Sequence, residues 1–208
     1  MSAYSSDSDQ TSNLLERVAD GDPVALERLL QLHRPYLRRL IAIRMGPALT
    51  ARVDASDVVQ ETQAVIAKRI ADFIERRPTS FRIWIRRKAL EQLVDQQRRH
   101  IGSQKRSILK EQQMSDVSSI AIARKLLSNS PSQILSKIEL QEQVRDLIDQ
   151  LSDKDREMLS LRHVEGLSNN EVADLLAIDP NTGRQRYGRA VRRLHQLLAQ
   201  NEISLGGT

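Results

Sequence analysis

Hydrophobic residues recur every three or four positions through most of the chain, which is the period of an α-helix that buries one face. The repeat is clearest over residues 23–45, 54–75, 80–100 and 168–198. No segment shows the strict alternation of apolar and polar residues that is typical of a half-exposed β-strand. The pattern therefore predicts an all-α protein.

Capping residues and helix breakers divide the first hundred residues into four helices. Asp22 followed by Pro23 is a typical helix start, because the carboxylate accepts backbone N–H bonds and proline presets the first helical dihedral. Gly46 and Pro47 end that helix, and Pro78 separates the last two. The expected helices are 12–19, 23–45, 54–75 and 80–100.

The second half of the chain contains a looser stretch and then another helical block. Ser, Gln and Lys are frequent over residues 103–136, which we interpret as a flexible linker, although residues 120–127 are apolar enough to form a helix or to contact a partner. Helices follow over 137–150 and 152–163. The sequence predicts two small helical domains joined by this linker. Their bounds are 1–11 (disordered tail), 12–102 (first domain), 103–136 (linker), 137–200 (second domain) and 201–208 (tail).

Residues 168–198 predict two helices joined by a tight turn. Ser168 and Glu171 have the spacing of a capping box, which fixes the start of the first helix, and Asp179 with Pro180 starts the second. The second helix carries one acid and five arginines, namely Arg184, Arg186, Arg189, Arg192 and Arg193. A helix-turn-helix with a basic second helix is typical of proteins that read DNA, because its first-turn side chains reach base edges while its cations meet phosphates.

Charge is concentrated in two places that are far apart in the sequence. The net charge is +5 in total, but residues 82–106 carry +6 and residues 179–200 carry +4, which leaves −5 for the rest. Two basic patches on an otherwise acidic chain indicate two contacts with one polyanion. The chain has no cysteine, which excludes disulfides and thiolate metal sites, and it has no apolar stretch long enough to enter a membrane. We therefore expect a cytoplasmic protein.

Hydrophobic positions of the first block predict its core, and two of them are aromatic. Phe81 and Trp84 could stack on bases, but their spacing of three within an apolar face favours a place in the core. The residues expected in this core are Val58, Val65, Ile66, Ile70, Phe73, Phe81, Trp84, Ile85, Ala89 and Leu93.

Asp54, Asp57 and Glu61 follow one another at helical spacing, which predicts three carboxylates on one helix face. One interpretation is that these acids stabilise the helix N-terminus through its dipole. A second is a magnesium site of the kind found in helical metal-dependent enzymes. A third is a docking surface for a basic partner. The residues alone leave all three open.

The order of these parts resembles the bacterial sigma factors of the sigma-70 family, and in particular the small extracytoplasmic-function group that keeps only the second and fourth conserved regions. The resemblance is carried by DASDVVQE (54–61), FRIWIRRKALEQLVDQQRRH (81–100) and the stretch from ELQEQ to HQLL (139–198). It covers residues 14–104 and 131–198. It implies a transcription initiation factor that binds core RNA polymerase and directs it to specific promoters.

The resemblance also implies roles for individual residues. Asp54, Asp57, Gln60 and Glu61 would dock on the clamp helices of the polymerase β′ subunit. The −10 element would be contacted by Arg76, Arg77, Arg82, Arg86, Arg87, Lys88, Arg98 and Arg99, and the loop 76–80 lies where the family captures a flipped base. The −35 element would be read by Asn181, Thr182, Arg184, Gln185, Arg186 and Arg189, on a domain that also meets the β flap. An anti-sigma factor is a further partner of this group, and no catalytic residue, metal or cofactor is expected.

Four residues depart from the pattern of the family. Glu91 stands where a polar Asn is usual in the −10 helix, and Ala177 stands where Gly is preferred in the turn. Gly183 replaces a buried Val of the recognition helix, and Gly188 adds a second glycine there, each at a cost of about 0.5–1 kcal/mol relative to Ala. We expect the recognition helix to be weakened by these glycines.

Other functions are compatible with parts of the sequence. A stand-alone helix-turn-helix regulator would bind palindromic operators as a dimer, and it leaves the patch at 82–106 without a role. A helical magnesium enzyme would be built around Asp54, Asp57 and Glu61, and a basic adaptor would bind nucleic acid without sequence preference. The lone histidines His33, His163 and His195 have no ligand spacing and are expected to be structural or surface residues.

Overall fold

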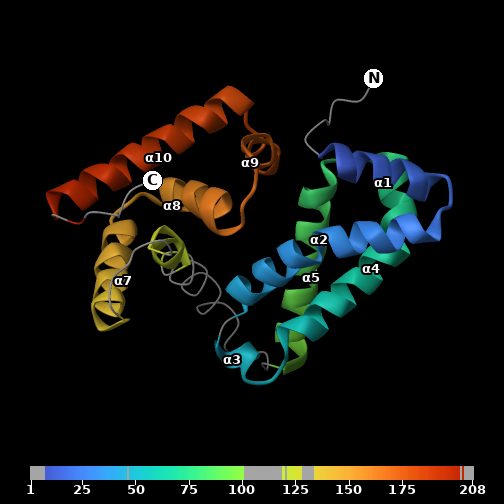
Figure 1. Cartoon of the computed structure of the whole chain (residues 1–208), viewed down its shortest axis with the longest axis horizontal. Helices are drawn as coiled ribbons and strands as arrows, with labels where there is room; N and C mark the ends of the chain where they lie inside the picture. The colour runs from blue at the N-terminus through green and yellow to red at the C-terminus, as the bar shows by residue number, and fades with distance from the viewer. Residues whose placement is uncertain are drawn as a thin grey trace. The chain divides into compact units, whose positions relative to one another are not determined.

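Every secondary-structure element in the described part of the chain is helical, so the all-α prediction is confirmed (Figure 1). The computed structural model describes residues 8–45, 47–100, 119, 121–127, 134–201 and 203. The chain divides into two compact units, Met1–Ile108 and Leu109–Thr208, each with its own core. Within the described ranges, no helix combines the length and the apolar character that crossing a membrane requires.

The N-terminal unit is built around α2, a long helix that packs against α1, α4 and α5. α4 and α5 also pack against each other. The short helix α3 was not expected from the sequence. The bounds are α1 Asp9–Ala19, α2 Pro23–Arg44, α3 Pro47–Thr50, α4 Ala55–Arg76 and α5 Phe81–His100.

Side-chain caps explain where the first two helices begin. The Asp22 carboxylate accepts bonds from the backbone N–H groups of Val24 at 2.9 Å and Ala25 at 3.1 Å, which confirms the predicted start of α2. α1 begins at Asp9 because the Ser8 hydroxyl accepts the N–H of Thr11 at 3.3 Å. The predicted tail over residues 1–11 is therefore too long, and residues 1–7 lie outside the described part.

Aromatic rings fill the core of the N-terminal unit. Phe81 is fully buried and Trp84 is 8% exposed, and their rings lie 5.4 and 4.8 Å from that of Phe73 on α4. The prediction that both are core residues is confirmed, so neither ring is available to stack on a base. Of the ten expected core residues, Val65 alone is half-buried and the other nine are buried.

The C-terminal unit is built around α10, which packs against α7, α8 and α9. The helix predicted over residues 152–163 is α8 followed by a π-helical turn, η2, which the sequence did not indicate. The bounds are α7 Ile134–Asp149, α8 Asp153–Leu159, η2 Ser160–Val164, α9 Asn169–Leu176 and α10 Pro180–Gln200.

Part of the predicted linker is folded into the C-terminal unit. Residues 121–126 are helical, and Ile122, Ala123 and Leu127 are fully buried. α7 also begins at Ile134, inside the predicted linker. The prediction of a flexible linker over 103–136 is therefore wrong for these two stretches, while the alternative of a helix near 120–127 is confirmed. Residues 101–118 lie outside the described part.

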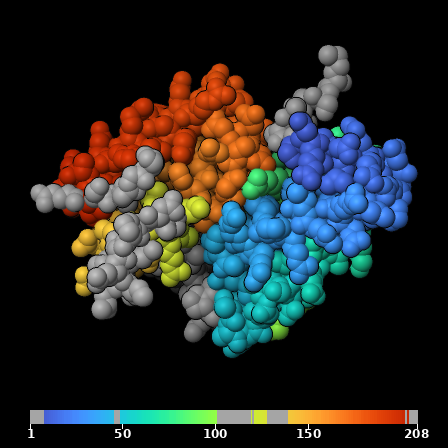
Figure 2. All heavy atoms as spheres, in the orientation of Figure 1, coloured from blue at the N-terminus to red at the C-terminus, as the bar shows by residue number. Residues whose placement is uncertain are grey.

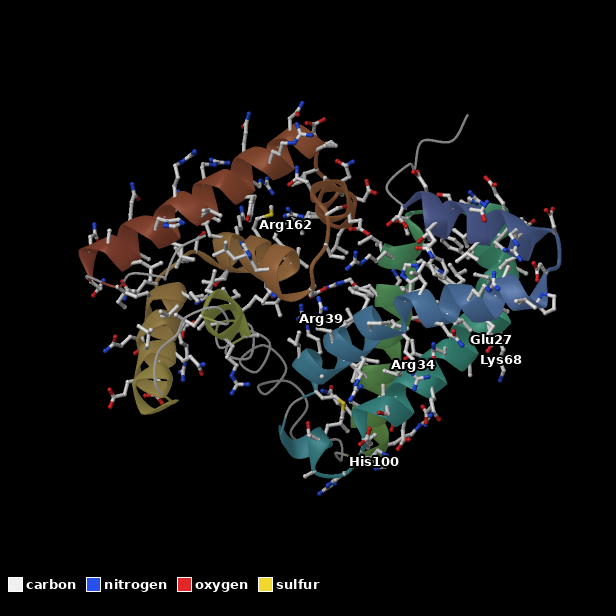
Figure 3. The ribbon with its side chains drawn as sticks, in the orientation of Figure 1. Glu27, Arg34, Arg39, Lys68, His100 and Arg162 are labelled. Atoms are coloured by element: carbon white, nitrogen blue, oxygen red, sulfur yellow. The ribbon has the colours of Figure 1, made fainter. Side chains whose placement is uncertain are left out.

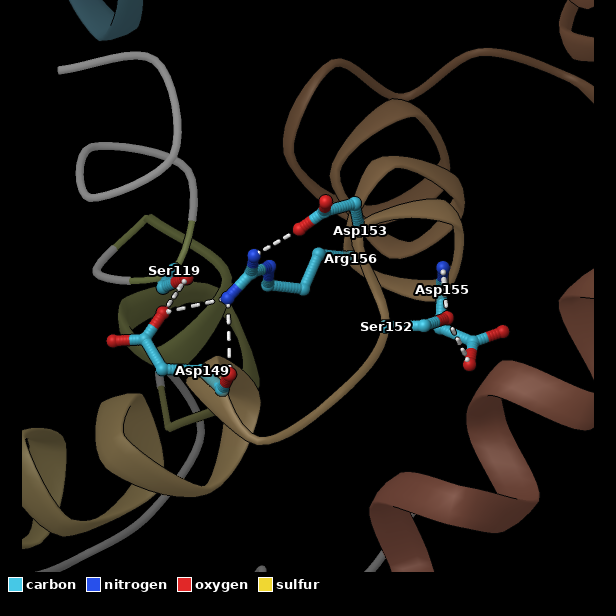
Figure 4. A network of polar contacts seen from close by, with 6 residues as sticks. All are labelled: Ser119, Asp149, Ser152, Asp153, Asp155 and Arg156. Atoms are coloured by element: carbon cyan, nitrogen blue, oxygen red, sulfur yellow. Dashed lines mark hydrogen bonds and ion pairs between the residues drawn. The ribbon is translucent and has the colours of Figure 1, made fainter. Parts of the chain in front are cut away.

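A polar network fastens this segment to the helices beside it (Figure 4). The buried Ser119 hydroxyl donates a 2.7 Å hydrogen bond to the Asp149 carboxylate at the end of α7. The Arg156 guanidinium of α8 donates to the backbone carbonyl of Asp149 at 3.0 Å and pairs with the carboxylate of Asp153. Ser119 is thus joined to the corner between α7 and α8.

Candidate nucleic-acid interface

The acidic cluster lies at the N-terminus of α4, and Asp54 is its cap. One carboxylate oxygen of Asp54 accepts the backbone N–H of Ser56 at 2.6 Å. This hydrogen bond holds the pKa of Asp54 below its usual value, and the positive charge of Arg38 acts in the same direction. Asp54 is therefore the N-cap of α4, whereas Asp57 and Glu61 lie within the helix.

Asp57, Gln60 and Glu61 lie on the first two turns of α4. Asp57 and Gln60 are exposed, whereas Glu61 is held by α5. The buried Gln96 amide donates a 2.7 Å hydrogen bond to Oε2 of Glu61, and Nη1 of Arg99 lies 3.8 Å from the same oxygen. The structure therefore brings an acid expected to dock polymerase next to an arginine expected to contact DNA.

The three acids do not form a metal-binding group. Among the described residues, no set of three His, Cys, Asp or Glu side chains is placed to hold a metal ion. Asp54 is committed to its cap and Glu61 to Gln96. The magnesium-enzyme interpretation thus gains no support from the geometry.

Several basic side chains of α5 are paired with acids of the N-terminal unit. Nζ of Lys88 lies 2.8 Å from a carboxylate oxygen of Glu91, so the acid that departs from the family pattern neutralises a neighbouring cation. Nη1 of Arg98 lies 3.5 Å from a carboxylate oxygen of Asp95, which is also three residues away along the helix. These are partly exposed pairs worth roughly 0–1 kcal/mol, which phosphates can displace at little cost.

The first turns of α5 carry three further arginines of the predicted −10 surface. The guanidinium of Arg82 lies over the ring of Tyr36 on α2, 4.4 Å from its centroid. Arg86 is half-buried and Arg87 is exposed. Of these three cations, Arg87 has the side chain most open to a ligand.

The loop between α4 and α5 has an unusual backbone at Arg77. Arg77 adopts a left-handed conformation with φ 35° and ψ 58°, and its N–H bonds the carbonyl of Phe73 at 2.7 Å. Ser80 then starts α5 by accepting the N–H of Ile83 at 3.4 Å. A left-handed residue other than glycine costs about 1 kcal/mol, so the sharp turn after the exposed Arg76 is maintained by the packing around it.

The helix-turn-helix has the predicted caps. The backbone N–H of Ser168 bonds the Glu171 carboxylate at 2.6 Å, and the N–H of Glu171 bonds the Ser168 hydroxyl at 3.2 Å. In the turn, Ala177 is left-handed with φ 51°, the conformation for which glycine is the favoured residue. Asp179 caps α10 by accepting the N–H of Asn181 at 2.8 Å. The predicted starts of both helices are confirmed.

Most of the residues expected to read the −35 element are accessible on α10. Figure 2 shows side chains of α10, in red, protruding from the C-terminal unit. Thr182 and Arg186 are half-buried, whereas Asn181, Arg184, Gln185 and Arg189 are exposed. The guanidinium of Arg184 donates a 3.2 Å hydrogen bond to the Asn181 side chain, so two of these groups are aligned before any ligand arrives.

α10 is anchored to the rest of its unit by polar contacts that the sequence did not reveal. The hydroxyl of Tyr187 lies 3.0 Å from Nε2 of His163, and the guanidinium of Arg162 lies over the Tyr187 ring at 5.2 Å. Arg193 pairs with the buried Asp155 of α8. Burial and the charge of Arg162 lower the pKa of His163, which is a structural residue as predicted.

Sequence reasoning missed a third group of cations, on α2. Arg34, Arg38 and Arg39 are exposed there, and Figure 3 labels two of them on the ribbon. Their spacing of four and one in LHRPYLRR was the available signal. The positive charge of Arg38 helps to lower the pKa of Asp54, so this group of cations acts electrostatically on the acidic N-terminus of α4.

Comparisons with known proteins match part of the C-terminal unit to one family and the chain as a whole to two known proteins. Residues 141–194 match the family described as "Sigma-70, region 4". The chain is 25% identical over 206 residues to the RNA polymerase sigma-H factor of Bacillus subtilis (strain 168), which covers 94% of this chain and 92% of that protein. Its fold is similar to that in the "Structure of CnrH in complex with the cytosolic domain of CnrY", with a TM-score of 0.50, 22% identity, and coverage of 92% of this chain and 99% of that one.

Proposed function

We propose that this chain is a transcription initiation factor of the sigma-70 family, which binds core RNA polymerase and directs it to specific promoters. The observation that carries this function is the capped helix-turn-helix at residues 168–200, which falls largely within the segment that matches region 4. The presence of two helical units fits the extracytoplasmic-function group, as the sequence resemblance implied. Such a factor acts by binding, and it works beside the chromosome in the cytoplasm.

In this proposal, the N-terminal half of α4 docks on the β′ clamp helices of polymerase. Asp57 and Gln60 are exposed there, and Glu61 presents a half-exposed carboxylate. Asp54 contributes indirectly, because its carboxylate is occupied in capping the helix. The partner surface is therefore expected to be basic and to meet the exposed sides of the first two turns of α4.

The −10 element is assigned to α5 and the loop before it. Promoter opening removes bases from the stack, which costs a few kcal/mol and is offset by contacts to phosphates and unstacked bases. Arg76, Arg77 and Arg87 are the cations that these contacts would use first. Arg82, Arg86, Lys88, Arg98 and Arg99 would follow, and Lys88, Arg98 and Arg99 must first exchange a carboxylate for a phosphate.

The −35 element is assigned to the first turns of α10. Arg and Gln side chains bond guanine and adenine in two places at once, so Arg184 and Gln185 are suited to direct base readout. Asn181, Thr182, Arg186 and Arg189 would position the helix on the phosphates. The same unit would meet the polymerase β flap, and an anti-sigma factor is the further partner expected to restrain the protein.

The proposal is tested by co-elution of the purified chain with sigma-free core RNA polymerase on a sizing column. We expect stoichiometric co-elution of the wild type and its loss in Asp57→Arg, which reverses an exposed charge at the docking face. Glu75→Arg is the matched control, because it reverses an exposed acid at the far end of the same helix. If the wild type does not co-elute, a stand-alone DNA-binding regulator replaces the initiation factor as the explanation of the helix-turn-helix.

A further inference from the structure

Two side chains of α5 share one oxygen of Glu61, and they differ in how firmly they hold it. Nε2 of Gln96 lies 2.7 Å from Oε2 of Glu61, whereas Nη1 of Arg99 lies 3.8 Å from it. The side chain of Arg99 is 60% exposed, and Gln96 is 4% exposed as a residue. Gln96 is therefore a fixed partner of the carboxylate, and Arg99 is an exchangeable one.

Gln96 occupies a position that would ordinarily be apolar. It follows Ala89 and Leu93 at spacings of seven and three along the buried face of α5, and both of those residues are buried. A buried amide stabilises the fold only when it is hydrogen-bonded. The Glu61 carboxylate, 35 residues away on α4, accepts its bond.

The same burial prevents Gln96 from meeting a partner directly. At 4% exposure its amide has no surface to offer a macromolecule, while the side chain of Glu61 is 43% exposed. Any effect of Gln96 on binding must therefore pass through Glu61. Fixing a carboxylate before binding reduces the side-chain entropy that association would otherwise cost.

We propose that Gln96 is a positioning residue for polymerase docking, which holds the Glu61 carboxylate at the surface of α4 in the orientation that a cation of core RNA polymerase meets. This inference rests on the proposed function, in which α4 is the docking helix. Because Arg99 contacts the same oxygen, the arriving cation displaces it. The released guanidinium of Arg99 is then available to a promoter phosphate, so that docking and DNA contact are coupled through one carboxylate.

The test is equilibrium binding of the fluorescently labelled full chain to sigma-free core RNA polymerase. Gln96→Met keeps the volume of the side chain and removes the amide, and we expect roughly fivefold weaker binding, because the freed Glu61 side chain must then be ordered on association. The matched control is Gln97→Met on the neighbouring, half-buried position, which should bind as the wild type does. In a Glu61→Gln background, Gln96→Met should cause little further loss, because its effect passes through the Glu61 carboxylate.

Arg99→Gln provides a second measurement that does not disturb the core. Removing the competing guanidinium should strengthen polymerase binding, by about twofold for an exposed pair. The inference is overturned if Gln96→Met binds polymerase as tightly as the wild type does. It is also overturned if the double variant loses as much binding free energy as the two single variants lose together. If Gln96→Met does not fold, unchanged or weaker binding of Arg99→Gln overturns it. Failure of the wild type itself to bind overturns the proposed function, and this inference with it.

Discussion

Nε2 of His33 lies 3.1 Å from Oγ1 of Thr11, which ties the middle of α2 to the first turn of α1. The ring of His33 also meets Phe81 edge-on, with centroids 5.0 Å apart. Burial among these groups lowers the pKa of His33 from 6.5 to about 4, and the charge of Arg82 contributes. The imidazole is therefore neutral in the folded protein at neutral pH, as a packing and hydrogen-bonding group.

The lowered pKa of His33 predicts that the protein loses stability as the pH falls. Between pH 6.5 and about 4 the unfolded chain binds a proton at His33 that the folded chain does not, so the stabilisation is present above pH 6.5 and is lost below it. We expect the free energy of unfolding to fall by about 2 kcal/mol between pH 7 and pH 5 because of this residue. Urea unfolding of the wild type and of His33→Gln at both pH values measures it. Equal losses in the two proteins would show that His33 is not responsible.

Gly183 lies on the packed side of α10, and a methyl group fits there. A Cβ at this position would lie 3.6 Å from Cβ of Ala173 and 3.9 Å from Cδ1 of Ile178, which are ordinary van der Waals distances. We expect Gly183→Ala to stabilise the protein by about 0.5–1 kcal/mol, because alanine loses less backbone entropy in a helix.

Gly21→Ala is the opposite control for this prediction. Gly21 has φ +84°, which alanine adopts only with strain, so the same substitution should destabilise the protein by about 1 kcal/mol. Thermal unfolding of both variants gives the comparison. A lower midpoint for Gly183→Ala would mean that the site does not accept the methyl group.

Arg193 is expected to act on stability, although it belongs to the basic helix. Its partner Asp155 is 7% exposed and also accepts a 2.8 Å bond from Ser152. Arg193→Met removes one hydrogen-bond donor from a buried carboxylate, which should lower the free energy of unfolding by about 1–3 kcal/mol. Arg189→Met, at an exposed site on the same helix, should leave the unfolding midpoint unchanged. Equal midpoints for the two variants would argue against a structural role for the pair.

Arg184 and Arg189 should affect DNA binding in different ways. Arg184 is the fifth residue of α10, near the N-terminus of the helix, where a base contact is expected. Arg184→Ala should therefore reduce the free energy of binding by about 1–3 kcal/mol on a cognate −35 duplex and by much less on an unrelated duplex. Arg189→Ala, at a proposed phosphate contact, should weaken binding to both duplexes and lower the salt slope by about one. Titrations of the polymerase-bound factor at several salt concentrations measure both effects. An equal loss on both duplexes for Arg184→Ala would remove it from base readout.

Helix starts could be predicted because the signals that set them are local. Asp22 with Pro23, Ser168 with Glu171, and Asp179 with Pro180 each place a cap within three residues of the N–H groups that it satisfies. Ser8 acts in the same way on α1, but it stands in a stretch of serines and aspartates that reads as a tail.

The pairs that restrain the candidate site could not be predicted, because they join residues far apart in the chain. Gln96 and Glu61 are 35 residues apart, and Arg193 and Asp155 are 38 apart. Nothing in the local sequence around this glutamine or this arginine indicates that its side chain pairs with a distant carboxylate. The roles of the individual polymerase and DNA contacts stay predictions, since family resemblance assigns them residue by residue and the geometry supplies only their exposure and partners.

The burial of Ser119 and its neighbours shortens the tether between the two units, each of which is proposed to contact DNA. With residues 103–136 free, 34 residues of linker would span up to about 120 Å when fully extended. Ser119 is fixed to Asp149, however, so only 19 residue steps separate it from His100, the last residue of α5, and their greatest reach is about 65 Å. We therefore expect this factor to accept a narrower range of spacings between its two promoter elements than the length of its polar middle segment suggests.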